Sequence, residues 1–314
     1  MQFQPRNEKP RGESHNSDPG TADSTRLCLP MKIPKRLQPL VEDGLIDAVL
    51  RQLMSGKEAM VFVVRCGEEI RCAKVYKEAN KRSFRQAVDY TENRKTKNTR
   101  RARAMEKGTR YGRKAQEEAW QSAEVDALYR LGAAGVRVPV AYNFHEGVLL
   151  MELVTDADGE PAPRLNDIEF SADEARGHHR MLMTQVVRML CAGVVHGDLS
   201  EFNVLVGSGG PVIIDLPQAV DAAGNNHAKS MLERDVLNLT NYFGRYAPDL
   251  LTTEYGKEIW SLYEHGALTP DVQLRGRFEL VLKPVDLDSV VREIDDARAE
   301  EAARRMRMAE KAVR

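Results

Sequence analysis

The stretch Val195-His-Gly-Asp-Leu-Ser-Glu-Phe-Asn-Val-Leu205 decides how this sequence is interpreted, because it places polar side chains between two apolar runs. Asp198 and Asn203 lie within it, and Asp215 follows shortly after, at the end of a short β-branched run. A carboxylate at the end of such a run is costly to bury without a partner. Hard cations such as Mg²⁺ take oxygen ligands, usually one or two protein carboxylates together with substrate phosphates. The three residues therefore predict a site that handles a phosphate with a divalent metal.

Length and composition set the broad class of the protein. The chain has 314 residues, 42% of them hydrophobic and 30% charged, which is typical of a soluble globular protein with one bilobal domain or two small ones. The net charge of −1 excludes nucleic-acid binding through overall charge. No apolar run reaches the roughly 18 residues of a membrane span, and no secretory signal is visible. The four cysteines form no C-x-x-C pair, so we expect reduced thiols and a cytoplasmic location without membrane attachment.

Composition and hydrophobic periodicity divide the chain into four parts. Residues 1–30 are rich in Pro, Gly, Ser and charge and are predicted to form a disordered tail. Residues 31–154 contain strand-like runs and predict a small β-rich lobe, which includes a basic flexible loop at 90–114. Residues 155–285 predict a larger, mostly helical lobe, and residues 286–314 a charged helix.

The small lobe contains a lysine in an unusual setting. Val61–Val64 and Ile70–Tyr76 are predicted to pair across a turn, which places Lys74 inside an apolar strand. Lysine is rarely buried without a partner, so Lys74 either extends its ammonium group to solvent or binds an anion. Glu124, on a helix predicted over residues 115–131, is the candidate partner of Lys74; an exposed glutamate is the alternative.

The turn of residues 55–59 lies between two strand-like runs and is built of small and polar residues. Its backbone N–H groups suit a loop that approaches phosphates, although a plain hairpin turn fits the local sequence equally well.

A one-sided run of charge occupies residues 94–114, with ten basic residues and only Glu106 opposing them. Such a run repels itself, which favours a flexible loop that docks on RNA or on acidic surfaces over a solvated helix face. Only Tyr90 and Tyr111 could stack on bases, so we do not expect base-specific recognition.

Two further helices are predicted in the large lobe. Ser171 and Glu174 fit a capping box that begins a long helix, which Gly193 ends. A second helix is predicted from Asn226 to Phe243. In this second helix, Arg234 and Asp235 either brace the polar stretch or form a surface pair.

The motifs together resemble a known family. His196 to Asn203 has the H-x-D-x-x-x-x-N spacing of the protein-kinase catalytic loop, which aminoglycoside and choline kinases share. With Ser55-Gly-Lys-Glu-Ala59 and Ile213-Ile-Asp-Leu-Pro-Gln-Ala-Val220, the ordered set resembles the RIO family of atypical serine/threonine kinases over about residues 41–284. Within that family, the chain resembles bacterial-type members of the branch that lacks an N-terminal winged helix. It implies an α+β, bilobal, protein-kinase-like fold.

The resemblance also implies a role for each matching residue. Asp198 would be the catalytic base or would position the acceptor hydroxyl, while Asn203 and Asp215 would bind Mg²⁺. In RIO proteins the residue equivalent to Asp215 can accept phosphate, so Asp215 is also a catalytic candidate and an ATPase switch in small-ribosomal-subunit maturation is implied. The residues implied to bind ATP are Ser55, Gly56, Lys57, Glu58, Ala59 and Val61 at the triphosphate loop, Lys74 with Glu124 at the α- and β-phosphates, and Met151, Glu152 and Val154 at the adenine.

Two other classes of function stay open. One is a small-molecule phosphotransferase of the aminoglycoside- or choline-kinase type. The 55–59 loop and the residues after Asp215 favour the RIO family over this class. The other is a non-catalytic ribosome- or RNA-associated protein that binds through residues 94–114, against which the complete set of catalytic positions argues.

Overall fold

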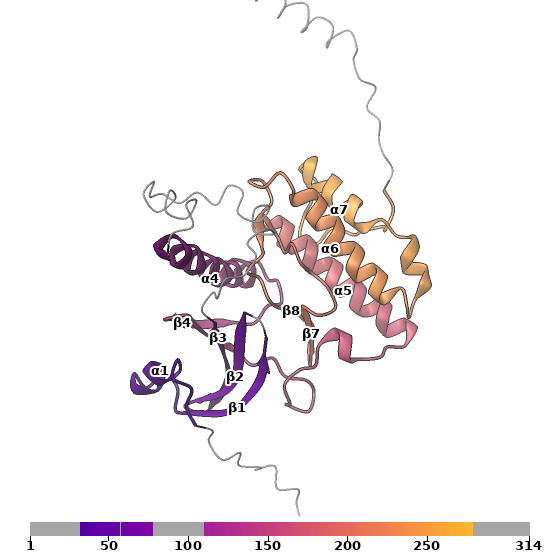
Figure 1. Ribbon diagram of the computed structural model, residues 1–314. Helices are drawn as coiled ribbons and strands as arrows, with labels where there is room; N and C mark the ends of the chain where they lie inside the picture. The colour runs from indigo at the N-terminus through magenta and orange to yellow at the C-terminus, as the bar shows by residue number, and fades with distance from the viewer. Residues whose placement is uncertain (1–31, 57, 78–109, 279–314) are drawn as a thin grey trace, which may run out of the picture. The chain divides into compact units, whose positions relative to one another are not determined.

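The computed structural model describes residues 32–56, 58–77 and 110–278 (Figure 1). The predicted N-terminal tail, the charged C-terminal helix, Lys57 and the basic run before residue 110 lie outside the described residues. The described part forms two compact units, divided between Leu153 and Val154, with residues 122–139 assigned to the second unit. We describe each unit by itself.

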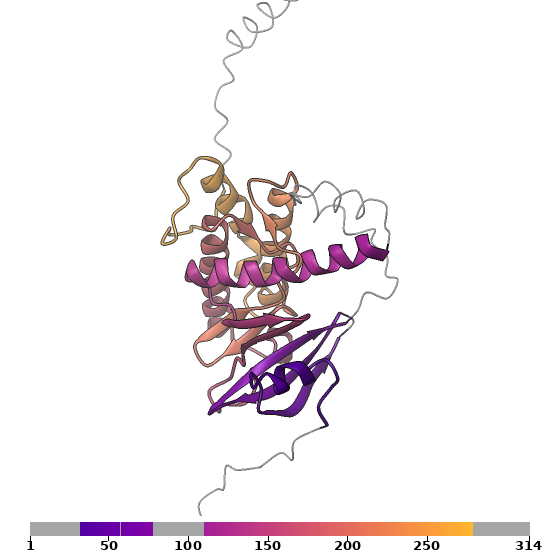
Figure 2. The same ribbon diagram turned by 90° about the vertical axis from the view of Figure 1, so that its left-hand side faces the viewer.

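The first unit contains a five-stranded antiparallel sheet in the order β1-β2-β3-β5-β4. Its strands are β1 (Ala48–Ser55), β2 (Ala59–Cys66), β3 (Glu69–Tyr76), β4 (Ala141–His145) and β5 (Val148–Glu152), and a short helix, α1 (Gln38–Glu42), precedes them. Figure 2 shows α1 against the indigo strands. The predicted pairing of Val61–Val64 with Ile70–Tyr76 is confirmed, because β2 and β3 pair with Val61 opposite Lys74.

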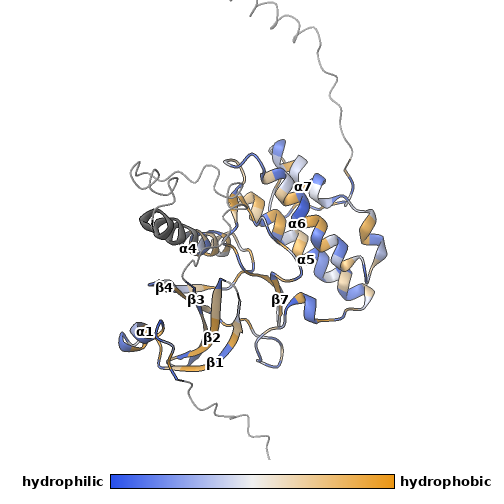
Figure 3. Ribbon diagram, viewed as in Figure 1, coloured by the Kyte–Doolittle hydropathy of each residue, from blue (hydrophilic) through white to orange (hydrophobic). Residues whose placement is uncertain are grey.

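The two faces of this sheet differ in character. One face presents Phe62, Ala73 and Leu150, which lie opposite one another on neighbouring strands and pack with Leu37 and Leu40 in a buried core. Because side chains alternate along a strand, the neighbouring positions point to the other face. The mixture of apolar and polar residues along these strands is visible in Figure 3.

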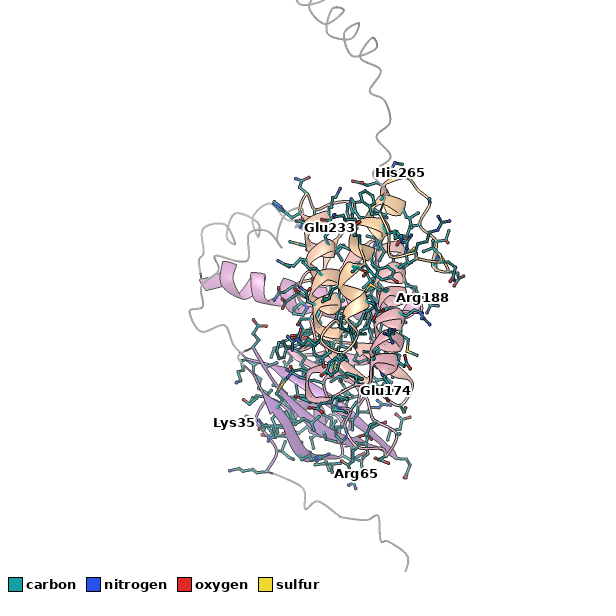
Figure 4. The ribbon with its side chains drawn as sticks, turned by 90° about the vertical axis from the view of Figure 1, so that its right-hand side faces the viewer. Lys35, Arg65, Glu174, Arg188, Glu233 and His265 are labelled. Carbon is teal, nitrogen blue, oxygen red and sulfur yellow. The ribbon has the colours of Figure 1, made fainter. Side chains whose placement is uncertain are left out.

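The second unit is mainly helical. It contains α5 (Ala172–Cys191), α6 (Ala228–Phe243), α7 (Tyr255–Glu264), and the 3₁₀ helices η2 (Leu165–Asp167) and η3 (Pro248–Thr252). Two small two-stranded sheets pair β6 (Val194–Val195) with β9 (Val220–Asp221) and β7 (Val204–Gly207) with β8 (Gly210–Ile213). The helix α6 contacts both α5 and α7. Figure 4 labels Glu174 and Arg188 towards opposite ends of α5.

The start and end of α5 follow the sequence prediction. The Ser171 hydroxyl accepts a hydrogen bond from the Glu174 N–H at 3.4 Å, and the Glu174 carboxylate accepts the Ser171 N–H at 2.9 Å. This pair is the predicted capping box. The helix ends at Cys191, and Gly193 follows with φ of 70°, a conformation that glycine adopts at little cost.

The helix α4 (Arg110–Ala133) departs from the sequence prediction at both ends. It begins at Arg110, so the last residues assigned to the basic loop are helical, and it continues past Gly132, with Gly135 taking the left-handed conformation instead. The apolar residues from Val136 onward suggest a strand, but β4 starts only at Ala141, because Pro139 has no N–H to donate to a strand ladder. Within the described ranges, no helix is long and apolar enough to cross a membrane.

Candidate active site

The loop between β6 and β7 carries Asp198 and Asn203. Asp198 is exposed, whereas Gly197 and Leu199 on either side of it are buried. The Asn203 side-chain amide donates to the Asp198 carbonyl oxygen at 2.8 Å, and the Asn203 N–H donates to the Ser200 carbonyl at 3.0 Å. The side-chain nitrogen of Asn203 is thus used inside the loop, and its side-chain oxygen is the atom that suits a metal ion.

The buried carboxylate of Asp235, on α6, anchors this loop. Its two oxygens accept the Gly197 N–H at 2.7 Å and the Leu199 N–H at 3.0 Å, one on each side of Asp198. Burial raises the pKa of Asp235 to about 7, although both N–H bonds and the neighbouring Arg234 lower it. The sequence left open whether Asp235 braces the loop or lies in a surface pair; with an exposed fraction of 2%, it braces the loop.

Two further side chains of α6 bind the same loop. Arg234 donates to the Gly197 carbonyl, and the Asn238 side chain donates to the Leu199 carbonyl at 3.1 Å. Asn238 was not predicted from the sequence. The backbone on both sides of Asp198 is therefore fixed through its N–H groups and its carbonyl groups.

His196 links the loop to the segment that carries Asp215. Its Nε2 lies 3.1 Å from the Ile214 carbonyl oxygen, and its Nδ1 accepts the Asp198 N–H at 3.3 Å. A carbonyl oxygen requires a donor and an N–H requires an acceptor, so the ring is neutral and protonated on Nε2. Burial lowers the pKa of His196, which favours the same neutral form.

Asp215 follows β8 and is exposed. Its φ is 65°, a left-handed conformation that few residues other than glycine adopt, and aspartate is among those that tolerate it. The Ile214 N–H donates to the Asn203 carbonyl at 3.0 Å, which ties this segment to the loop of Asp198. A carboxylate and an amide oxygen on two joined loops fit the ligand chemistry of Mg²⁺.

The carboxyl group of Asp198 has a perturbed pKa. Partial burial raises this pKa and the charge of Asp215 raises it further, while His196, Arg234 and the bond to Asn203 lower it. Gln218, which the sequence did not single out, places its Nε2 at 3.5 Å from Asp198 Oδ2. A carboxylate of raised pKa in a fixed loop suits acceptance of a proton.

In the first unit, several residues implied to bind ATP share one face of the sheet. Val61 on β2 lies opposite Lys74 on β3. Met151 on β5 lies opposite Cys72, which is two residues before Lys74 on β3 and therefore points to the same face. This face is the one opposite the α1 core. The Lys74 ammonium lies 5.4 Å from the centre of the Tyr76 ring.

The turn that joins β1 to β2 contains the described residues of the predicted phosphate loop. The Gly56 N–H donates to the Ala59 carbonyl at 2.9 Å and closes the turn. Ser55 and Glu58 are exposed, whereas Ala59 is buried at the start of β2.

The segment predicted to bind adenine is anchored by its own hydrogen bonds. The Glu152 N–H donates to the Val140 carbonyl at 2.8 Å, and the Glu152 carboxylate accepts the Val140 N–H at 3.1 Å. In the second unit, the Val154 carbonyl accepts the Ala162 N–H at 2.9 Å.

Glu124, the predicted partner of Lys74, lies in the second unit and has an exposed fraction of 2%, which excludes the alternative of an exposed glutamate. Lys74 lies in the first unit, so the pairing of these two residues stays a prediction.

Comparison with known proteins identifies the family. The sheet unit, the helical unit and the polar loop define the class of kinase-like α+β proteins. The family model RIO1, described as RIO domain, matches residues 60–255. The RIO-type serine/threonine-protein kinase Rio1 of Haloferax volcanii is 36% identical over 211 residues, which cover 67% of this chain and 68% of that protein. The chain therefore belongs to the RIO family of kinases.

Other relatives agree. The RIO-type serine/threonine-protein kinase Rio1 of Methanocaldococcus jannaschii is 32% identical over 65% of this chain and 68% of its own length. The human serine/threonine-protein kinase RIO1 is 34% identical over 42% of this chain, but the match spans only 23% of the human protein.

Proposed function

We propose that this protein is an ATP- and magnesium-dependent serine/threonine protein kinase of the RIO type. The observation that carries the proposal is the position of Asp198 in a loop whose flanking N–H groups are both held by the buried Asp235. Phosphoryl transfer is catalysed mostly by positioning and by charge neutralisation, so a fixed carboxylate beside two oxygen ligands meets its main requirement.

In this proposal Asp198 accepts the proton of the acceptor hydroxyl. The hydroxyl oxygen forms a bond to the γ-phosphorus, the bond from that phosphorus to the β–γ bridging oxygen breaks, and ADP leaves with the electron pair. Asn203 and Asp215 would hold Mg²⁺, which supplies positive charge to the phosphates. The raised pKa of Asp198 makes its carboxylate a better proton acceptor than an ordinary aspartate.

The residues proposed to hold the nucleotide are those that the resemblance to the RIO family implies. Ser55, Gly56, Lys57, Glu58 and Ala59 would cover the triphosphate and Lys74 with Glu124 would hold the α- and β-phosphates. Val61 would lie beside the triphosphate loop, and Met151, Glu152 and Val154 would surround the adenine end.

A finer proposal concerns the acceptor of the phosphoryl group. Asp215 is exposed and lies in a segment joined to the loop of Asp198. One of its carboxylate oxygens would bond to the γ-phosphorus, the bond from that phosphorus to the β–γ bridging oxygen would break, and ADP would leave with the electron pair, giving an acyl phosphate. Water would then release phosphate, and the protein would act as an ATPase switch. Residues 94–114 would contact RNA of a ribosomal particle in the cytoplasm, and such binding should weaken steeply as salt is raised.

One experiment separates these possibilities. The full chain is incubated with γ-labelled ATP and Mg²⁺, with and without a protein mixture, and the labelled protein is treated with hydroxylamine. Label that hydroxylamine removes indicates an acyl phosphate, and stable label indicates Ser or Thr. Asp198→Ala should bind ATP but lose turnover, and Glu233→Gln, a substitution on α6 at the position labelled in Figure 4, serves as the matched control.

Two outcomes would contradict the proposal. Unchanged phosphotransfer and ATP hydrolysis in Asp198→Ala would remove the role of Asp198. Turnover of aminoglycosides or choline without any labelled protein would favour a small-molecule phosphotransferase.

A further inference from the structure

Lys77 is the first residue after β3, and it contacts the turn of residues 55–59 through both its backbone and its side chain. Its N–H donates to the Glu58 carbonyl at 2.7 Å. Its ammonium group donates to the Gly56 carbonyl at 2.6 Å and to the Ser55 hydroxyl oxygen at 3.1 Å. One lysine therefore contacts three residues of the turn.

The turn that Lys77 contacts follows an irregular strand. The register of β1 against β2 shifts between Gln52 and Met54, and β1 is exposed from Arg51 to Ser55 at the edge of the sheet. A bulge disrupts the ladder locally, and pairing resumes beyond it with Met54 opposite Val61 and Ser55 opposite Met60. Charge-assisted hydrogen bonds are stronger than neutral ones, and the Lys77 ammonium makes two of them here.

The geometry also leaves Lys77 suited to an anion. A lysine ammonium has three N–H donors, of which Ser55 and Gly56 accept two. The group is half-buried at the turn, so its positive charge is fixed beside the backbone that would cover a triphosphate.

We propose that Lys77 is a positioning residue of the nucleotide loop: it holds Ser55, Gly56 and Glu58 in their turn and donates its third N–H to a phosphate oxygen of ATP. This inference rests on the proposed function. Lys77, directly after β3, would be a second lysine besides Lys74 that contacts the phosphates.

The test compares the binding of ATP with that of adenosine, which lacks the phosphates. Lys77→Met should weaken ATP binding, or raise the KM for ATP, about tenfold, with kcat changed much less. Adenosine affinity should stay within about twofold, and Lys77→Arg should restore most of the ATP affinity because it keeps the charge. Lys257→Met, which removes an exposed lysine paired with Glu254 on α7, is the matched control.

The results distinguish the inference from the proposed function. If wild-type protein binds neither ATP nor adenosine, the proposed function fails and the inference with it. If wild-type protein binds ATP and Lys77→Met binds it equally well, only the inference is overturned. Equal loss of ATP and adenosine binding, or no restoration by Lys77→Arg, also overturns the contact with phosphate. If Lys77→Met does not fold, comparison of Lys77→Gln with Lys77→Arg gives the same test.

Discussion

The buried histidine on α5 makes the stability of the helical unit depend on pH. His179 is 1% exposed, its Nε2 lies 3.1 Å from the Thr240 hydroxyl oxygen on α6, and its ring packs against Phe243 and Tyr255. Burial lowers the pKa of His179 from 6.5 to about 4. Between these two values the unfolded chain binds a proton that the folded chain does not bind, so lowering the pH destabilises the fold.

The magnitude follows from the two pKa values. One pKa unit corresponds to about 1.4 kcal/mol, so the full shift amounts to roughly 3 kcal/mol once the pH is below 4. At pH 7 the unfolded histidine is mostly neutral and the contribution is nearly zero. At pH 5 the linkage relation gives a loss of about 2 kcal/mol in the free energy of unfolding.

The assay is urea unfolding followed by circular dichroism at pH 7 and pH 5. His178 and His196 also have lowered pKa values from burial, so the wild-type protein alone does not isolate His179. His179→Gln keeps a polar side chain that does not titrate. The free energy of unfolding of this variant should fall by about 2 kcal/mol less than that of wild type between the two pH values. Equal losses in the two proteins would refute the reasoning.

Three further predictions concern the loop and the helix that precedes it. Asp198→Asn should lower kcat for ATP turnover by about a thousandfold or more while ATP affinity, measured by calorimetry, changes little, because general-base catalysis typically contributes 10²–10⁴. Asp235→Asn keeps one acceptor oxygen for two N–H groups, so kcat should fall about tenfold relative to Glu233→Gln; equal kcat values would show that the anchor is not needed. Ser171→Ala removes the capping box and should lower the free energy of unfolding by about 1 kcal/mol, measured by urea titration; no change would mean that the cap is replaced by water.

Local patterns in the sequence were enough to predict much of the fold. The capping box at Ser171 and the glycine at position 193 predicted the two ends of α5, because each of these signals depends only on neighbouring residues. The alternation of apolar residues in β2 and β3 predicts their pairing for the same reason. The start of α4 was not predicted, because a densely basic stretch has no apolar periodicity to indicate a helix.

The support of the site was harder to predict. Asp235, Asn238 and Gln218 contact the loop of Asp198 from 20 to 39 positions away in the sequence, and no local pattern encodes such contacts. Glu124 is different, since it precedes Leu128 and Leu131 at helical spacing and its burial could have been inferred from that face.

The left-handed backbone at Asp215 has a consequence for which amino acids this position can accept. Glycine, asparagine and aspartate enter this conformation most readily, and β-branched residues do so at a high cost. Of the three tolerated residues only aspartate carries a negative charge. If Asp215 has the proposed role, backbone geometry and chemistry favour aspartate independently, and a library of all substitutions should separate the two effects. Asparagine and glycine variants should fold but lack activity, whereas valine and isoleucine variants should lose both stability and activity.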